Sequence, residues 1–215
     1  MTRIKVFVEG QTEETFVRDV LDPYFASQGI YLTAILAQTS PGHKGGIVSY
    51  AKIRHQIDKL CKDDSHCWIT TLIDFYKFPK DAPGRQDESY SGLRDCYDKV
   101  NYLQERMATD IDRHNFVPFL MLHEFEAILF CQPEKMAEWL DDVPVGQLRQ
   151  IADSFSSPEE INEGEQTAPS KRIVQHVPRY KKTAHGPIVA EDIGLDIIRA
   201  KCPHFNRWLE QIAAL

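Results

Sequence analysis

Three acidic side chains follow segments that have the composition of buried strands. Glu9 follows the β-branched, apolar stretch Ile4–Val8, and Asp74 ends a continuous apolar run that begins at Cys67. Glu124 comes shortly after a third such stretch. Carboxylates held close together cannot all stay ionised without compensation, so they either raise a pKa or bind a hard divalent cation. The strand ends are therefore the first place to look for chemistry.

Two further acids stand beside these three. Glu13 lies one residue into the helix expected after Gly10, and Glu126 follows Glu124 by two positions. A site of oxygen ligands without thiolates is typical of Mg²⁺ or Mn²⁺ and not of zinc. One or two such ions support an in-line displacement at phosphorus by activating water and neutralising the leaving oxygen. The candidate metal ligands are Glu9, Glu13, Asp74, Glu124 and Glu126.

One basic segment complements these acids. Residues 170–185 contain five lysines and arginines and no acid. A lysine or arginine of this segment near the scissile phosphate would assist a metal ion. The alternative, given equal weight, is that the basic segment is only a solvated surface. His123 either orients a carboxylate, acts as a base or has only a structural role. The candidate phosphate-binding and nucleic-acid-binding residues are Lys171, Arg172, Lys181 and Lys182, and the candidate catalytic residues are Glu9, Asp74, Glu124 and Lys171.

Alternating strand and helix patterns position these residues. Apolar positions at helical spacing separate the β-branched stretches, which predicts an α/β fold with a mainly parallel sheet and right-handed crossovers. Thr12 is expected to cap the first helix, Pro118 to place the fourth strand at an edge or a bulge, and 153–165 to form an acidic loop. The expected strands are 4–8, 30–37, 67–73 and 116–122, and the expected helices between them are 12–24, 47–61 and 93–107.

Composition excludes several classes of protein. The chain has 215 residues, 42% apolar and 27% charged, and no apolar run approaches the roughly 18 residues that a membrane span needs. Its five scattered cysteines argue against a zinc site or a disulfide framework and favour a cytoplasmic location. A net charge of −7 has the wrong sign for holding nucleic acid by bulk electrostatics. A local basic patch, a metal ion or a partner would therefore have to bind the nucleic acid.

The strand-end motifs resemble a known family. Val8–Glu13 is similar to the first motif of the Toprim domain, in the V-E-G-x-T-E form found in nucleases of the overcoming-lysogenization-defect type. Other segments resemble a Toprim-like family catalogued as domain of unknown function 4276, and together they cover most of the chain. These segments are Leu72–Tyr76, His123–Ala127, Ala168–Arg172, Tyr180–Lys182, Cys202–Phe205 and Trp208–Leu209.

The resemblance implies a Toprim-like Rossmannoid fold, with a mainly parallel central sheet of about four strands flanked by helices and a helical C-terminal extension. The expected core is 1–132, and the expected helical part is 133–215. Glu9 would be the first-motif acid, acting as general base or metal ligand, and Glu13 a ligand of a second metal. Asp74 would be the first aspartate of an Asp-x-Asp motif, whose second aspartate is missing because Phe75 and Tyr76 follow. Two-metal occupancy then depends on Glu124 or Glu126.

The leading hypothesis is a Mg²⁺- or Mn²⁺-dependent nuclease, with DNA favoured over RNA as substrate. The resemblance also implies an ABC-type or AAA-like ATPase partner in anti-phage defence, and a homodimer stays open. The alternative from another class is a non-catalytic Toprim-like module that regulates or scaffolds the ATPase. A small-molecule phosphohydrolase or a primase-like enzyme is a third possibility, although a primase would be expected to carry a template-binding zinc module.

Overall fold

The computed structural model of the chain describes residues 1–40, 43–44, 49–76, 78–161, 164 and 166–215. These residues divide into two compact units. The first unit is residues 1–121 with Leu215, and the second is 122–214. Each unit is described by itself below. The expected division into a core of 1–132 and a helical part of 133–215, in the same domain or as a small subdomain, stays a prediction, which limited proteolysis would test.

A parallel sheet forms the centre of the first unit. Its strand order is β2-β1-β5-β6, and β7 also pairs with β5. All of these pairings are parallel. The expected α/β class with a mainly parallel sheet is confirmed, with five strands in place of about four. The strands are β1 (Thr2–Val8), β2 (Ile30–Leu36), β5 (Trp68–Asp74), β6 (Phe116–Val117) and β7 (Leu120–Met121).

The fourth expected strand is divided in two at Pro118. Proline has no backbone N–H, so it cannot continue the ladder against β5. The Thr71 hydroxyl spans the interruption, because it donates to the Phe119 carbonyl at 2.6 Å and accepts from the Phe119 N–H at 2.8 Å. β6 and β7 therefore both pair with β5, at an edge of the sheet, as the proline indicated.

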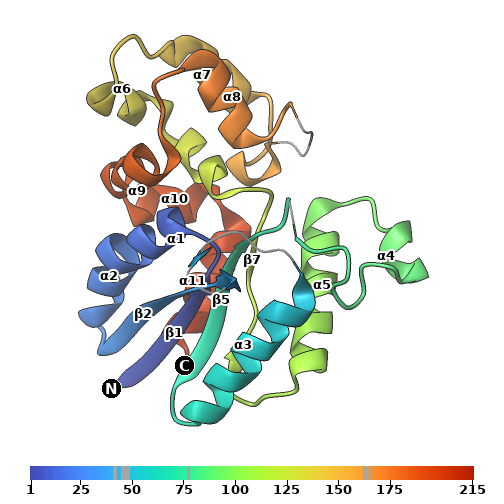
Figure 1. The fold of residues 1–215 in the computed structure, drawn as a ribbon. Coiled ribbons are helices and arrows are strands. Elements are labelled where there is room, and N and C mark those ends of the chain that lie inside the picture. The colour runs from blue at the N-terminus through green and yellow to red at the C-terminus, as the bar shows by residue number, and fades with distance from the viewer. Residues whose placement is uncertain (41–42, 45–48, 77, 162–163, 165) are drawn as a thin grey trace. The chain divides into compact units, whose positions relative to one another are not determined.

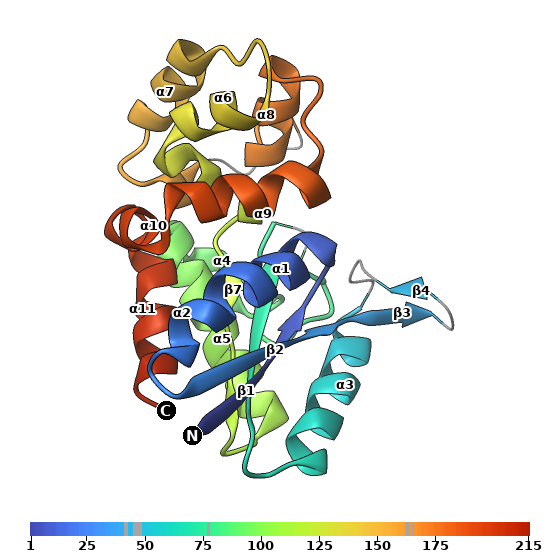
Figure 2. The same ribbon diagram turned by 90° about the vertical axis from the view of Figure 1, so that its left-hand side faces the viewer.

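Helices cover both faces of this sheet, as right-handed crossovers require when the strand order reverses direction. In Figure 2, α1 and α2 lie on one side of the sheet and α3 on the other. α5 packs beside α3 and against β6. The helices are α1 (Gln11–Phe16), the π-helical turn η1 (Val17–Leu21), α2 (Asp22–Ala26), α3 (Tyr50–Asp63), α4 (Glu88–Gly92) and α5 (Cys96–Ile111). Two short strands, β3 (Gln38–Ser40) and β4 (His43–Lys44), pair with each other in antiparallel orientation.

Two helix starts differ from the sequence expectation. Gly10 occupies the N-cap of α1 and no side chain caps this helix, so the expected cap at Thr12 is wrong. Thr12 lies inside the first turn and is buried, which removes its hydroxyl from the capping position. The second expected helix begins at Tyr50, and positions 47–48 of the expected range lie outside the described residues.

The second unit is built from short helical segments that bury large aromatic side chains. Phe125, Phe130, Phe205 and Trp208 are each at most 1% exposed. Figure 1 shows these segments in yellow to red. They are η2 (Phe125–Cys131), η3 (Pro133–Lys135), α6 (Met136–Trp139), α7 (Val145–Asp153), η4 (Pro158–Glu160), α8 (Pro169–His176), α9 (Lys182–Ile193), α10 (Leu195–Lys201) and α11 (Pro203–Ala213).

The acidic stretch 153–165 is not simply a solvated loop. It contains η4, and Glu159 within it is 0% exposed. The Glu159 carboxylate accepts the His204 N–H at 2.9 Å and the Phe205 N–H at 2.8 Å. This acid therefore holds the beginning of α11, which the sequence expectation missed. Positions 162, 163 and 165 of the stretch lie outside the described residues.

No helix formed by the described residues combines the length and the apolar character that crossing a bilayer requires.

Candidate functional site

The ends of β1 and β5 carry the first two predicted acids. These strands are neighbours, and their pairing continues as far as Val8 with Leu72. Glu9 stands one residue beyond that pair and Asp74 two residues beyond it, at the same edge of the sheet. Both side chains are partly exposed. The carboxyl edge of an open parallel sheet is where ligands bind, so the sheet topology places both acids at a binding edge.

Glu13 approaches the same edge from α1. Its side chain is 7% exposed although it lies in the first helical turn. A Cβ atom added to Gly10 would stand 3.1 Å from Glu13 Oε2, so the carboxylate folds back over the backbone next to Glu9. The glycine permits this close approach. The first unit therefore gathers Glu9, Glu13 and Asp74 around one strand end and its neighbour.

The residues after Asp74 supply no second acid. Phe75 is 5% exposed, and its N–H donates to the Met121 carbonyl at 2.9 Å. Asp74 itself pairs with Met121 in the ladder between β5 and β7. The backbone is thus fixed by the sheet on both sides of the aspartate, and an aromatic ring occupies the next position.

In the second unit, the buried carboxylate of Glu124 holds a helix start. Its Oε2 accepts the Ser170 N–H at 3.0 Å, and the residue is 6% exposed. Ser170 is the second residue of α8, whose first turn offers unsatisfied N–H groups and a positive dipole end. Glu124 therefore acts in this structure as the counter-charge of α8.

Glu126 is matched by a lysine. Its Oε2 lies 3.1 Å from Lys182 Nζ, and the glutamate is 1% exposed. Burial raises the pKa of the Glu126 carboxyl to about 7, the Lys182 ammonium opposes this shift, and the Glu124 carboxylate adds to it. Oε1 is buried and has no hydrogen-bond partner among the described residues. A buried carboxylate oxygen in this state is costly, which makes it a candidate acceptor for a proton or a ligand.

The predicted basic residues fall into two groups. Lys171 and Lys181 are exposed. Arg172 is held, because its Nε donates to the Thr167 carbonyl at 2.7 Å and its guanidinium lies 5.7 Å from the centre of the Phe155 ring. Lys182 is half exposed and pairs with Glu126. Two of the four predicted phosphate-binding residues thus also have structural contacts.

His123 has an unusual backbone conformation. Its φ is +63°, in the left-handed region that a non-glycine residue rarely adopts, and its side chain is 2% exposed. Such strain costs roughly 1–3 kcal/mol and persists where the surrounding structure demands it. His123 turns the chain into the segment that carries Glu124 and Glu126. Whether the imidazole orients a carboxylate, acts as a base or has only a structural role stays a prediction.

Each set of acids fits a metal ion differently. Glu9, Glu13 and Asp74 have the hard oxygen donors that Mg²⁺ and Mn²⁺ prefer. Glu124 and Glu126 already bind an N–H group and an ammonium, which they would have to exchange for a cation. Across the described part of the chain, no group of three or more His, Cys, Asp or Glu side chains is arranged to hold a metal. The donors of the first unit therefore fit such an ion in type, and their arrangement as its ligands stays a prediction.

Sequence reasoning missed two residues that shape these segments. Ser170 supplies the N–H that Glu124 binds, and Pro169 at the start of α8 is a signal that could have located it. Arg85 lies 5.2 Å from the centre of the Phe75 ring, next to Asp74. No local sequence pattern predicts the contact between Arg85 and Phe75, because the two residues meet only when the intervening loop folds.

Comparison with known proteins adds a family and a set of distant folds. The model of a family described as a domain of unknown function, DUF4276, matches residues 8–213. No curated protein matches the sequence. The C-terminal region of the Burkholderia pseudomallei OLD protein is similar at 16% identity and a TM-score of 0.49, covering 100% of this chain and 98% of that one. The same region of the Xanthomonas campestris pv. campestris OLD protein gives 16% identity and a TM-score of 0.45, with the same coverage.

Proposed function

Since the chain belongs to the DUF4276 family, whose description assigns no activity, we propose from its site that it hydrolyses phosphodiester bonds in nucleic acid with a divalent cation. The observation that carries this proposal is the placement of Glu9 and Asp74 at the ends of adjacent parallel strands. Two carboxylates at the binding edge of a sheet are costly without a cation, and a hard cation offsets that cost.

Glu9, Glu13 and Asp74 are the residues proposed to hold the ion. Mg²⁺ or Mn²⁺ bound there would lower the pKa of a water molecule and neutralise charge at the scissile phosphate. Tyr76 stands where the second aspartate of an Asp-x-Asp motif would follow Asp74. This favours one ion over two. Glu9 is the proposed acceptor of the proton from the attacking water, because it is partly exposed and leads from the end of β1.

The second unit is proposed to supply cations to the phosphate backbone. Lys171 and Lys181 are exposed and stand at either end of a segment that holds no acid. Glu126 fixes Lys182, and Glu124 fixes the helix that carries Lys171. In this proposal the two buried glutamates place cationic groups, and they become metal ligands only if they give up those contacts. Lys171 remains the proposed catalytic cation.

DNA is the proposed substrate, and an ABC-type or AAA-like ATPase is the proposed partner in anti-phage defence. The support for the partner is the motif resemblance together with the net charge of −7, which opposes unassisted binding to a polyanion. A partner that encloses DNA would supply the grip that the chain lacks.

A non-catalytic scaffold is the second candidate function. The observation that favours it is the engagement of both Glu124 and Glu126 by protein donors. In a scaffold these acids would only stabilise the second unit, and Glu9 and Asp74 would contribute to a partner surface. The two candidates differ in whether a divalent cation changes what the protein does to DNA.

Plasmid nicking tests the proposal. The purified chain is incubated with supercoiled plasmid in Mn²⁺, in Mg²⁺ and in chelator, alone and with a candidate ATPase partner. We expect nicking that needs the cation and is lost in Asp74→Asn, which changes the charge of one side chain with little change in volume. Absence of nicking in every condition, with the ATPase present, would favour the scaffold.

A further inference from the structure

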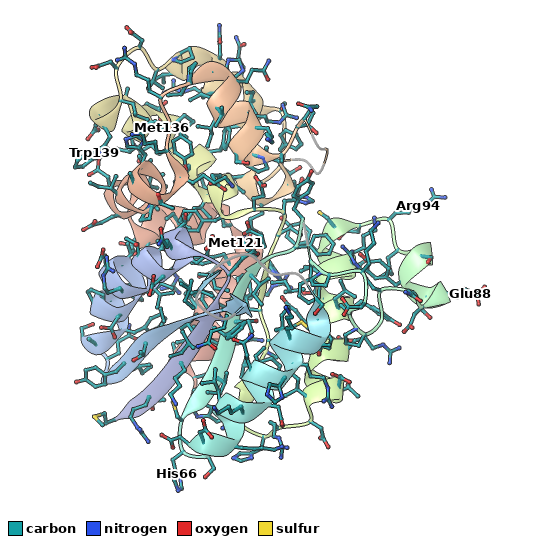
Figure 3. All side chains as sticks on the ribbon, in the orientation of Figure 1. His66, Glu88, Arg94, Met121, Met136 and Trp139 are labelled. Atoms are coloured by element: carbon teal, nitrogen blue, oxygen red, sulfur yellow. The ribbon has the colours of Figure 1, made fainter. Side chains whose placement is uncertain are left out.

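A compact loop follows the strand that ends in Asp74. It covers residues 78–95 and includes α4. In Figure 1 this loop projects beyond α5, and in Figure 3 the labelled side chains of Glu88 and Arg94 mark its outer end. The described part of the loop lies within the first unit. One arginine of the loop, Arg85, contacts the residue directly after Asp74.

Arg85 lies between two aromatic rings. Its guanidinium carbon is 5.2 Å from the centre of the Phe75 ring and 5.5 Å from the centre of the Tyr90 ring. The same group donates to the Tyr90 hydroxyl and, at 3.2 Å, to the Phe78 carbonyl. A planar guanidinium can stack and donate at the same time, which an ammonium cannot do. Arg85 thereby joins the start of the loop, α4 and the residue after Asp74.

The contact with Phe75 reaches the proposed metal ligand. Phe75 is bonded to Asp74, and its N–H donates to the Met121 carbonyl at 2.9 Å. The Phe78 N–H donates to the Phe75 carbonyl at 3.1 Å, which closes a turn directly after the aspartate. Because Arg85 contacts the Phe75 ring at one end of this turn and the Phe78 carbonyl at the other, removing its guanidinium would loosen the turn, while the pairing of Asp74 and Phe75 with Met121 remains.

The far side of the loop is held independently of Arg85. Gly84 has φ +82°, and a Cβ atom there would come 2.6 Å from Arg106 Cγ and 2.9 Å from Tyr102 Cε1. The Tyr102 hydroxyl donates to Asp87 Oδ2 at 2.6 Å, and the Arg106 guanidinium carbon lies 4.8 Å from the Tyr102 ring centre. Arg106 thus makes a second cation–π contact, within α5 and facing Gly84 of the same loop.

We infer that Arg85 is a positioning residue for the proposed reaction, holding the turn that follows Asp74 through the ring of Phe75. This inference rests on the proposed function for its catalytic meaning. The ring is the acceptor through which the loop holds the segment directly after the strand end.

The test compares Arg85→Met and Arg85→Lys with the matched control Arg106→Met, each in the full chain. Amide hydrogen exchange is followed in peptides that cover β5 and the turn after it, without added metal. The Mn²⁺ concentration that gives half-maximal plasmid nicking is measured in parallel. Exchange needs no activity, so it reports on the positioning even where nicking is absent.

We expect Arg85→Met to speed exchange in the turn after Asp74 by about tenfold and to raise the required Mn²⁺ about fivefold. Arg85→Lys should stay close to Arg85→Met because it keeps the charge but loses the planar stack, and Arg106→Met should match the wild type in both measurements. Unchanged exchange in Arg85→Met, or an equal effect in Arg106→Met, would overturn the inference. If Arg85→Met exchanges faster than the wild type but the wild type never nicks DNA, the proposed function is contradicted and the positioning role still stands.

Discussion

The two units treat their acids differently. Glu9 and Asp74 in the first unit are partly exposed at the ends of adjacent strands, where the sheet topology places them. Glu124 and Glu126 in the second unit are buried, and each binds a donor of the protein itself. The acids of the second kind stabilise parts of the second unit. For the acids of the first kind we propose a cation from solution, because of their position at the ends of adjacent strands.

Glu9→Gln is the strongest test of the difference between the acids of the two units. The substitution removes the charge at the end of β1 and should reduce metal-dependent nicking by about a thousandfold, while the melting temperature stays within a few degrees. Glu14→Gln, in the first turn of α1, is the matched control and should retain activity. Equal activity of Glu9→Gln and wild type would mean that the strand-end acids are as structural as those of the second unit.

The buried acids of the second unit can be tested by the pH dependence of stability, and Glu159 is the acid to use. Burial raises the pKa of its carboxyl to about 7, against the opposing effect of the His204 and Phe205 N–H groups. The folded chain therefore binds a proton more tightly than the unfolded chain, so this group stabilises most below pH 4.5 and the contribution is lost as pH rises towards 7. The free energy of unfolding in urea should fall by about 3 kcal/mol across that window from this group.

Glu159→Gln is the variant that isolates this contribution. The slope of its unfolding free energy against pH should be less steep than that of the wild type over the same window. The difference should correspond to one proton fewer released on unfolding. The variant should also be less stable at low pH, because an amide has only one oxygen for the two N–H donors. An unchanged slope would show that Glu159 titrates alike in the folded and unfolded chains.

Lys182→Met tests the ion pair of the second unit. It leaves Glu126 buried without its cation and should cost about 2 kcal/mol of unfolding free energy in urea. Lys181→Met alters the adjacent exposed lysine and is expected to leave stability unchanged. In the double variant Lys182→Met/Glu126→Gln, much of the lost stability should return, since no buried charge remains. A cost equal in both single variants would refute the structural role of the pair.

The smallest effect is expected at Gly10. Gly10→Ala brings a methyl group to 3.1 Å from Glu13 Oε2, which must shift by a few tenths of an ångström. We expect about fivefold weaker Mn²⁺ activation of nicking with little change in stability. Gly92→Ala is the control, because a Cβ atom there meets nothing within 4 Å. Unaltered Mn²⁺ activation in Gly10→Ala would separate Glu13 from the metal.

Sequence reasoning could place the strand-end acids because it depended on a short-range rule. A buried strand announces itself by its apolar residues, and the next residue must stand at the sheet edge, as Asp74 does. The break at Pro118 was also local, since a missing N–H interrupts any ladder. Fold class and strand-end positions both follow from patterns that span only a few residues.

The remaining features depend on contacts between distant residues. Glu159 meets the N–H groups of α11 across more than forty positions, so its charge alone suggested a solvated loop. Glu126 and Lys182 are 56 positions apart, and their pairing appears only when η2 and α9 come together. The sequence supplied both residues as candidates but could not tell a metal ligand from a lysine partner.

The central claim is that a divalent cation binds to the strand-end acids of the first unit. Mn²⁺ binding to the wild type, Asp74→Asn and Glu126→Gln, followed by electron paramagnetic resonance of the free ion, tests it without requiring catalysis. The account predicts that Asp74→Asn abolishes binding and that Glu126→Gln retains it. Loss of binding in Glu126→Gln alone, or equal binding in all three proteins, would contradict it.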